Sequence, residues 1–116
     1  MQVGMDTTPI THYYGKDHDR LDTLFKNFQQ LKRVDVANAK VNFREFKFGL
    51  QRHIIWEEEI LFPLFDRITG MSGRGPTEVM RHEHRQILQY LELIYAKVRV
   101  HNPESDEEEG MLLTFL

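Results

Sequence analysis

The sequence predicts an all-α protein, an antiparallel up-down helical bundle, and three observations carry this prediction. Apolar residues recur at every third or fourth position through most of the chain, as they do in amphipathic helices. No stretch of useful length alternates apolar and polar residues as a half-buried strand does. The connections between the periodic segments are short, which favours antiparallel neighbours. The chain has 116 residues, and residues 1–116 are expected to form a single domain.

The first half of the chain is expected to form two helices after an irregular lead-in over residues 1–14. The first helix spans about residues 18–33, with Asp17 as its N-cap. The second spans about residues 36–68 and is longer. Pro63 lies inside it and lacks the N–H that a helix interior needs, so a kink or a local end is expected there.

The second half is expected to form two more helices. The glycine-rich segment 70–76 predicts a loop, and a third helix follows it to about residue 100. Ser105, with Glu108 three residues later, matches a capping box and predicts the start of a fourth helix. That helix reaches Leu116 without a glycine, a basic last turn or a polar exit, so we expect it to be truncated.

The composition argues against several classes of function. The chain has no cysteine, which excludes disulfides, thiolate catalysis, zinc fingers and iron–sulfur ligation by cysteine. Its net charge of −3 argues against a nucleic-acid partner, which would require a basic surface. No segment has the pattern of a signal peptide or the length of a membrane span, so a cytoplasmic protein without a membrane partner is expected.

Each of the three long helices is expected to turn one histidine toward the interior. His18 is three residues before Leu21 and shares its face of the first helix. His53 and Glu57 lie four residues apart on the apolar face of the second helix. His84 lies on the apolar face of the third helix.

The polar neighbours of these residues are expected to face solvent. His82 lies about 200° from His84 around a helix, on the opposite side. Glu58 and Glu59 are rotated by about 100° and 200° from Glu57, so Glu57 is the inward glutamate of the three.

Three inward histidines and one inward glutamate point to a metal site. Imidazole nitrogen and carboxylate oxygen are the ligand set of non-haem iron, and also of zinc or manganese. A cation beside a buried carboxylate offsets the cost of burying its charge. The predicted metal ligands are His18, His53, Glu57 and His84, although any one such histidine alone is more often an ordinary core or surface residue.

Other interpretations stay open for individual residues. Glu57 could instead pair with Arg44, with Arg52 or with a lysine of the first helix. His12 precedes the expected first helix, and His101 lies in a polar connection. Both are expected to be surface residues, and His101 could also interact with the C-terminal end of a helix.

Three segments, "KDHDRLDTLF", "HIIWEEEILFPLF" and "VMRHEHRQI", resemble the hemerythrin-like, or HHE cation-binding, family in order and spacing. The resemblance covers about residue 15 to the C-terminus, and the H-x-x-x-E pattern followed by "ILFP" is its most specific part. It implies an antiparallel four-helix bundle that holds an oxo- or hydroxo-bridged di-iron centre. Carried over residue by residue, it implies that His18, His53, Glu57 and His84 are metal ligands and that Glu57 is a bridging carboxylate.

The chain departs from the family's pattern in two places. Oxygen-carrying members have H-x-x-x-H on the third helix, whereas position 80 here is Met80 and position 88 is Leu88. This looks more like the broader bacterial group tied to iron handling, nitric oxide or oxygen sensing, and iron–sulfur repair. The family's fourth helix also supplies a histidine and a carboxylate, but no histidine follows His101. We therefore expect an incomplete site, and an open apolar seam that favours homo-oligomers.

The leading hypothesis is a metal-binding protein with a non-haem, di-iron site that binds O₂, NO or iron for sensing, storage or iron-centre repair. No second catalytic constellation is evident, so no enzyme activity is predicted. A mononuclear hydrolytic site would need a general base besides Glu57. The alternative hypothesis is a metal-free helical interaction or oligomerisation module, in which the inward histidines are core residues.

Overall fold

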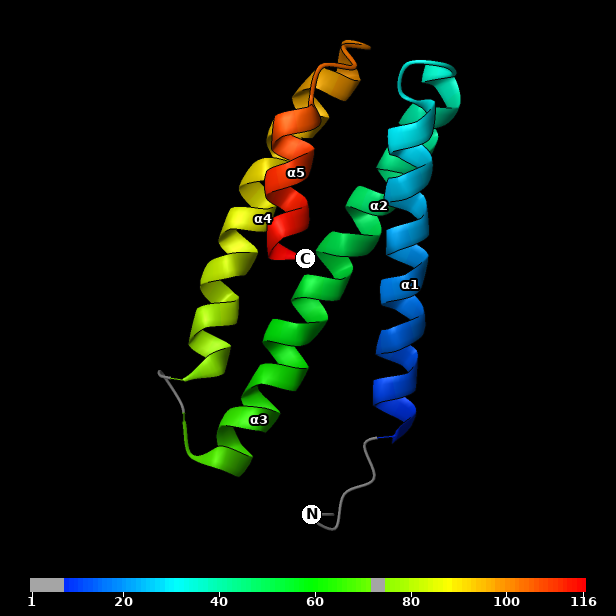
Figure 1. The fold of residues 1–116 in the computed structure, drawn as a ribbon. Coiled ribbons are helices and arrows are strands. Elements are labelled where there is room, and N and C mark those ends of the chain that lie inside the picture. Colours follow the sequence, from blue (N-terminus) through cyan, green and yellow to red (C-terminus); the bar gives the residue numbers. More distant parts are fainter. Residues whose placement is uncertain (1–7, 72–74) are drawn as a thin grey trace.

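The computed structural model describes residues 8–71 and 75–116, with side chains from residue 15 onward. The described part is helical and contains no strand. The elements in order are α1 (Thr8–Leu31), α2 (Val36–Trp56), the π-helical turn η1 (Glu57–Leu61), α3 (Phe62–Thr69), α4 (Pro76–Arg99) and α5 (Asp106–Phe115). The rod α2–η1–α3 runs antiparallel to both α1 and α4, and α5 runs antiparallel to α4 (Figure 1). The all-α, antiparallel bundle is confirmed.

The start of the first helix differs from the expectation. Helix α1 begins at Thr8, so residues 8–14 are helical, and the rest of the expected lead-in lies outside the described residues. Pro9 falls in the first turn, where a missing N–H breaks no helical hydrogen bond. Gly15 costs about 1 kcal/mol relative to alanine inside a helix, which tertiary packing can override. Asp17 is consequently an interior residue of α1, and its assignment as an N-cap was wrong.

The second expected helix is divided in the middle by η1. The N–H of Phe62 donates to the carbonyl oxygen of Glu57, five residues back, which is the π-helical pattern. Pro63 follows as the second residue of α3 and has no N–H to donate to the carbonyl of Glu59. The irregularity expected at Pro63 is therefore present, and it takes the form of a widened turn just before the proline.

Aromatic and aliphatic side chains fill the space between the helices. The rings of Phe25 and Phe46 have centroids 4.7 Å apart, and those of Phe28 and Phe43 are 5.0 Å apart, so α1 and α2 are joined by interlocked aromatics. The buried core consists of Leu21, Phe25, Phe28, Ala39, Phe43, Phe46, Leu50, Ile54, Ile87, Leu91, Ile94, Val98 and Leu112.

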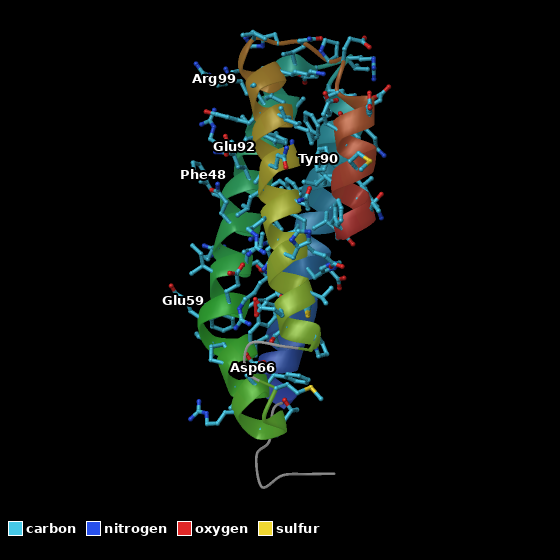
Figure 2. All side chains as sticks on the ribbon, turned by 90° about the vertical axis from the view of Figure 1, so that its left-hand side faces the viewer. Phe48, Glu59, Asp66, Tyr90, Glu92 and Arg99 are labelled. Carbon is cyan, nitrogen blue, oxygen red and sulfur yellow. The ribbon has the colours of Figure 1, made fainter. Side chains whose placement is uncertain are left out.

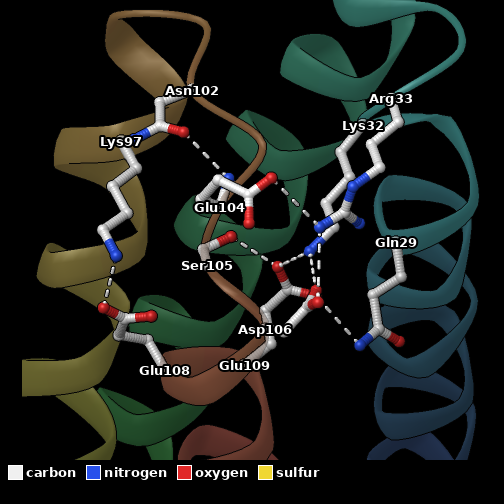
Figure 3. A network of polar contacts seen from close by, with 10 residues as sticks. All are labelled: Gln29, Lys32, Arg33, Lys97, Asn102, Glu104, Ser105, Asp106, Glu108 and Glu109. Atoms are coloured by element: carbon white, nitrogen blue, oxygen red, sulfur yellow. Dashed lines mark hydrogen bonds and ion pairs between the residues drawn. The ribbon is translucent and has the colours of Figure 1, made fainter.

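A buried polar network attaches the start of α5 to the end of α1 (Figure 3). The carboxylate of Glu109 accepts hydrogen bonds from the ammonium of Lys32, the amide of Gln29 and the hydroxyl of Ser105. Ser105 is the N-cap of α5, but its side chain makes no capping bond, so the capping box expected with Glu108 was wrong. Glu108 instead accepts a hydrogen bond from Lys97 at 2.6 Å.

The bundle is elongated, with a longest extent of 50 Å. Helix α5 has only ten residues and covers only part of the length of α4 (Figure 1). None of the described helices is both long enough and apolar enough to span a membrane. Phe115 and Leu116, at the end of α5, line a cavity that the predicted metal ligands also line.

Candidate metal centre

A cavity of about 220 Å³ lies between α1, α2, η1 and α4, next to the last residues of the chain. All four predicted metal ligands line it: His18, His53, Glu57 and His84. The other lining residues are Leu21, Asp22, Phe46, Leu50, Ile54, Met80, Glu83, Ile87, Phe115 and Leu116. The wall is therefore mainly apolar, with a few convergent polar groups, which is the ordinary make-up of a small-ligand or cofactor site.

Three of the four predicted ligands meet around one carboxylate oxygen. The Oε1 atom of Glu57 lies 3.1 Å from Nε2 of His53, one helical turn earlier on the same rod. The same oxygen lies 3.7 Å from Nε2 of His84 on α4. Both histidines therefore turn the same ring nitrogen toward Glu57 and toward the cavity.

The opposite ring nitrogen of each of these histidines faces a second carboxylate. Nδ1 of His53 lies 2.8 Å from Oδ2 of Asp17 on α1. Nδ1 of His84 lies 2.7 Å from Oε2 of Glu58 in η1. The prediction that Glu58 is a solvated glutamate was wrong, because its side chain is only 35% exposed and binds His84.

The third glutamate of the run behaves as expected. Glu59 is exposed and points away from the bundle (Figure 2). The difference from Glu58 follows from η1, because a π-helical turn has a wider circumference than an α-helical turn and changes the direction of successive side chains. The α-helical wheel used in the prediction does not describe this segment.

The carboxylates around His53 shift two pKa values in opposite directions. Burial alone would lower the pKa of His53, but hydrogen bonds to Glu57 and Asp17 outweigh it, and the pKa of His53 is raised. Burial alone would raise the pKa of Asp17, but hydrogen bonds from His53 and Arg20 outweigh it, and the pKa of Asp17 is lowered. A metal that binds Nε2 of His53 must displace the proton that the protonated imidazole carries on that nitrogen.

An aromatic ring supports the imidazole of His84. Phe62, the first residue of α3, stacks on this ring with centroids 5.5 Å apart and planes inclined by 17°. The guanidinium of Arg81 lies 5.2 Å from the centroid of Phe62 and pairs with the buried Asp66, which also accepts a hydrogen bond from Thr77. His84 is buried as a result, as its position on the apolar face of α4 predicts.

His18 stands apart from the other three predicted ligands. Its side chain is 49% exposed, and its Nδ1 lies 3.7 Å from Asp22, one turn further along α1. Its ring centroid is 6.5 Å from that of His53. His18 thus lies at the open rim of the cavity. His82 and His101 are both exposed, as expected, and neither lines the cavity.

The donor types fit a metal ion, whereas the present spacing is that of hydrogen bonds and ion pairs. Within the described residues, no group of three or more His, Asp or Glu side chains has the spacing of a metal site. A metal such as zinc would lie about 2.0–2.2 Å from each nitrogen or oxygen ligand. Two imidazole nitrogens that share one carboxylate oxygen in a common cavity nevertheless match the nitrogen and oxygen donors that iron, zinc and manganese take.

Sequence reasoning missed the two carboxylates that contact the Nδ1 atoms of the histidines, Asp17 and Glu58, here called the outer carboxylates. Asp17 immediately precedes a predicted ligand, and Glu58 immediately follows one. Asp17 lies four residues before Leu21 and seven before Leu24, so the spacing of the first helix places it on the apolar face, but the expectation that it caps the helix left this signal unused. For Glu58 the adjacency was the only signal, because an α-helical wheel rotates it away from Glu57. The contact between Asp17 and His53 joins two different helices, and a periodic pattern within one helix does not contain that information.

Comparisons with known proteins identify the family. The family model described as hemerythrin HHE cation-binding domain matches residues 10–116. An uncharacterized hemerythrin-like protein of Schizosaccharomyces pombe is 31% identical over 84 residues, which is 72% of this chain and 40% of that protein. No solved structure matches the chain significantly.

Proteins named for iron–sulfur cluster repair are similar as well. The YtfE proteins of Edwardsiella ictaluri and of Escherichia coli O157:H7 are 30% and 29% identical over 91 residues, in each case 73% of this chain and 41% of the relative. The chain thus spans about two fifths of the length of these relatives. The family match covers nearly the whole chain and includes the cavity, so the chain belongs to the hemerythrin-like HHE cation-binding family and is a hemerythrin-like metal-binding protein.

Proposed function

We propose that this chain binds non-haem iron in the cavity, with His18, His53, Glu57 and His84 as its ligands. The observation that carries the proposal is the convergence of Nε2 of His53 and Nε2 of His84 on Oε1 of Glu57. The family match supports a cation site, and the names of the YtfE relatives favour iron over zinc or manganese. A carboxylate can bridge two metal ions, so Glu57 is the residue that would allow a di-iron site.

The protein side chains provide shape, charge and exclusion of water. The three imidazoles give neutral nitrogen donors and Glu57 gives a negative oxygen donor, which suits a positive iron ion. Phe46, Ile87 and Phe115 line the same cavity and restrict access of water to it. When bound, iron supplies redox chemistry and open coordination positions, and we propose O₂ or NO as the small molecule that uses them.

The biological role that we propose is iron-dependent sensing, storage or repair of iron centres. The YtfE relatives are named for iron–sulfur cluster repair, which favours repair among the three. Because the chain spans about two fifths of their length, the activity of the whole relatives is carried over only as a proposal.

Paired variants of the histidines on α4 test the ligand assignment. His84→Ala should abolish stoichiometric iron binding, because it removes a nitrogen that faces Glu57. His82→Ala is the matched control and should retain iron, because His82 is exposed and does not line the cavity. Iron per chain after anaerobic loading with Fe(II) and desalting is the measurement.

The outcomes of this comparison are distinct. Equal loss of iron in both variants would refute the assignment of His84 as the ligand on α4. An absence of bound metal in the unmodified chain would favour the metal-free interaction module, in which the inward histidines are core residues.

A further inference from the structure

We propose that Asp17 and Glu58 are positioning residues for the metal site. Their carboxylates hold Nδ1 of His53 and Nδ1 of His84, so that Nε2 of each ring is directed at Glu57 and at the cavity. This inference rests on the proposed function, since it assigns a role to residues around the proposed ligands.

The first carboxylate acts across two helices. Asp17 on α1 lies 2.8 Å from Nδ1 of His53 on α2, and both side chains are only 11% exposed. Arg20, one turn later on α1, donates a hydrogen bond of 3.2 Å to the other oxygen of Asp17. Asp17 is therefore fixed by its own partner, and it can in turn fix the plane of the His53 ring.

The second carboxylate depends on the π-helical turn. Glu57 and Glu58 are consecutive in η1, and both reach the imidazole of His84. Glu57 faces Nε2 at 3.7 Å, and Glu58 faces Nδ1 at 2.7 Å. Single π-helical turns within α-helices are frequent at functional sites, and here the turn brings two neighbouring carboxylates to opposite nitrogens of one ring.

The chemistry of imidazole explains why this arrangement suits a metal ligand. A neutral imidazole carries one proton, and a nitrogen that binds metal must be the unprotonated one. A carboxylate at Nδ1 accepts a hydrogen bond from Nδ1–H, which keeps the proton on that nitrogen, leaves the lone pair on Nε2 and raises the basicity of Nε2. The same arrangement occurs twice in this site, on histidines from two different helices.

The geometry also separates Asp17 and Glu58 from the ligands. Each contacts Nδ1, the nitrogen that faces away from Glu57, and neither lines the cavity. Glu57, in contrast, lines the cavity and contacts the Nε2 atoms. The two outer carboxylates thus act on a metal through the histidines.

Alanine variants with neighbouring controls test the proposal. Asp17→Ala and Glu58→Ala remove the acceptors of Nδ1, whereas Asp19→Ala and Glu59→Ala remove exposed carboxylates close by in the sequence. Asp17→Asn and Glu58→Gln keep a carbonyl that can accept from Nδ1–H. The probe is Zn(II), which is diamagnetic and has no redox chemistry.

Two readouts are compared across these variants. Zinc affinity, measured by competition with a chelator, should fall by about 10- to 100-fold in Asp17→Ala and Glu58→Ala, as is typical for loss of such partners, and should recover in part in the amide variants. Nitrogen-15 NMR of the metal-free protein, at a pH where the histidines are neutral, should show Nδ1–H on His84, whose Nε2 lies 3.7 Å from Glu57, and both the Nδ1–H and the Nε2–H tautomers on His53, whose Nε2 lies 3.1 Å from Glu57. The alanine variants should shift the affected ring toward Nε2–H, and Asp19→Ala and Glu59→Ala should change neither readout.

The two readouts separate failure of this inference from failure of the proposed function. An unchanged NMR tautomer in both alanine variants would overturn the positioning role, whatever the metal affinity. A changed tautomer together with unchanged zinc affinity would overturn it as well. If the unmodified chain binds neither zinc nor iron, the proposed function fails, whereas the tautomers of the metal-free protein still decide whether the carboxylates orient the rings.

Discussion

At the scale of single residues, His101 shows how helix α4 ends. Its φ of 59° is left-handed, its N–H donates to the carbonyl of Val98 at 3.1 Å, and the N–H of Asn102 donates to that of Lys97 at 2.9 Å. This is a Schellman ending, in which glycine is the preferred residue at the position of His101. A residue with a Cβ atom is strained in this conformation.

Replacement of His101 with glycine should stabilise the protein. His101→Gly relieves the left-handed strain and is expected to raise the free energy of unfolding by about 1 kcal/mol. His101→Ala keeps a Cβ atom and should give no such gain. Urea denaturation measures both variants, and equal midpoints for the glycine and alanine variants would show that φ at this residue does not limit stability.

The spacing of apolar residues predicted which side of each helix faces the interior. It did not predict which side chains of different helices contact one another. The same spacing selected His84 over His82 and Glu57 over Glu59, and the structure places the selected residues at the cavity. Their role as metal ligands stays a prediction. Asp17 was set aside as an N-cap, and its contact with His53 was not predicted because that partner is 36 residues away on another helix.

At the scale of helices, the existence and type of the long elements followed from the spacing of apolar residues. The exact ends of the helices and their irregular turns did not follow from this spacing. Asp17 has the chemistry of an N-cap, but α1 continues through it, because the preceding residues can also adopt a helix. Ser105 has the chemistry of a capping box, but its hydroxyl donates to the buried Glu109, which also binds Lys32, and local sequence does not reveal this network.

The space around two helical glycines, Gly49 on α2 and Gly110 on α5, leads to opposite predictions for their replacement by alanine. A Cβ atom on Gly49 would lie 2.6 Å from Cδ2 of the buried Leu21 and 2.9 Å from Nη2 of Arg20. Overpacking costs about 1–3 kcal/mol and outweighs the gain in helix propensity of about 1 kcal/mol, so Gly49→Ala should destabilise the protein. A Cβ atom on Gly110 of α5 would meet nothing within 4 Å, so Gly110→Ala should stabilise it by up to about 1 kcal/mol.

Thermal or urea unfolding of Gly49→Ala checks the packing between α1 and α2, and that of Gly110→Ala checks the open space beside α5. A stabilising Gly49→Ala would mean that the two helices are further apart than the structure shows. A destabilising Gly110→Ala would mean that this part of α5 is packed against another element.

The start of α5 makes stability depend on pH in the acid range. Hydrogen bonding to Lys32 lowers the pKa of Asp106 below its ordinary value of 3.8, and hydrogen bonding to Lys97 lowers that of Glu108 below 4.5. A carboxyl group with a lowered pKa in the folded state stabilises that state fully above its ordinary pKa. The contribution is lost as the pH falls from there through the lowered value.

Melting temperatures measured downward from pH 6 should therefore fall in the acid range, in part through these two carboxylates. Lys97→Met should make the decline shallower, since it removes the cation that lowers the pKa of Glu108. Lys26→Met, at an exposed position of α1, is the control and should leave the slope unchanged. An identical slope in Lys97→Met and the unmodified chain would contradict the assigned role of Lys97.

At the scale of the whole molecule, the up-down bundle brings histidines from α1, α2 and α4 to one cavity. The site combines a buried side, where His84 lies, with an open rim, where His18 lies.

Exposed apolar side chains flank this region, among them Met80, Leu113 and Leu116. Homo-oligomer formation through this seam stays a prediction, and sedimentation velocity should show a dimer or larger species. A monomer at all concentrations would refute it.

The central claim is that this cavity is an iron site, and metal content tests it most directly. The unmodified chain and Glu57→Ala would be loaded with Fe(II) without air, desalted, analysed for iron and examined by absorption spectroscopy after exposure to air. We predict stoichiometric iron and new absorption bands in the unmodified chain, and loss of both in Glu57→Ala, which lacks the carboxylate shared by His53 and His84. Iron content that is negligible in both proteins, or equal in both, would contradict the account.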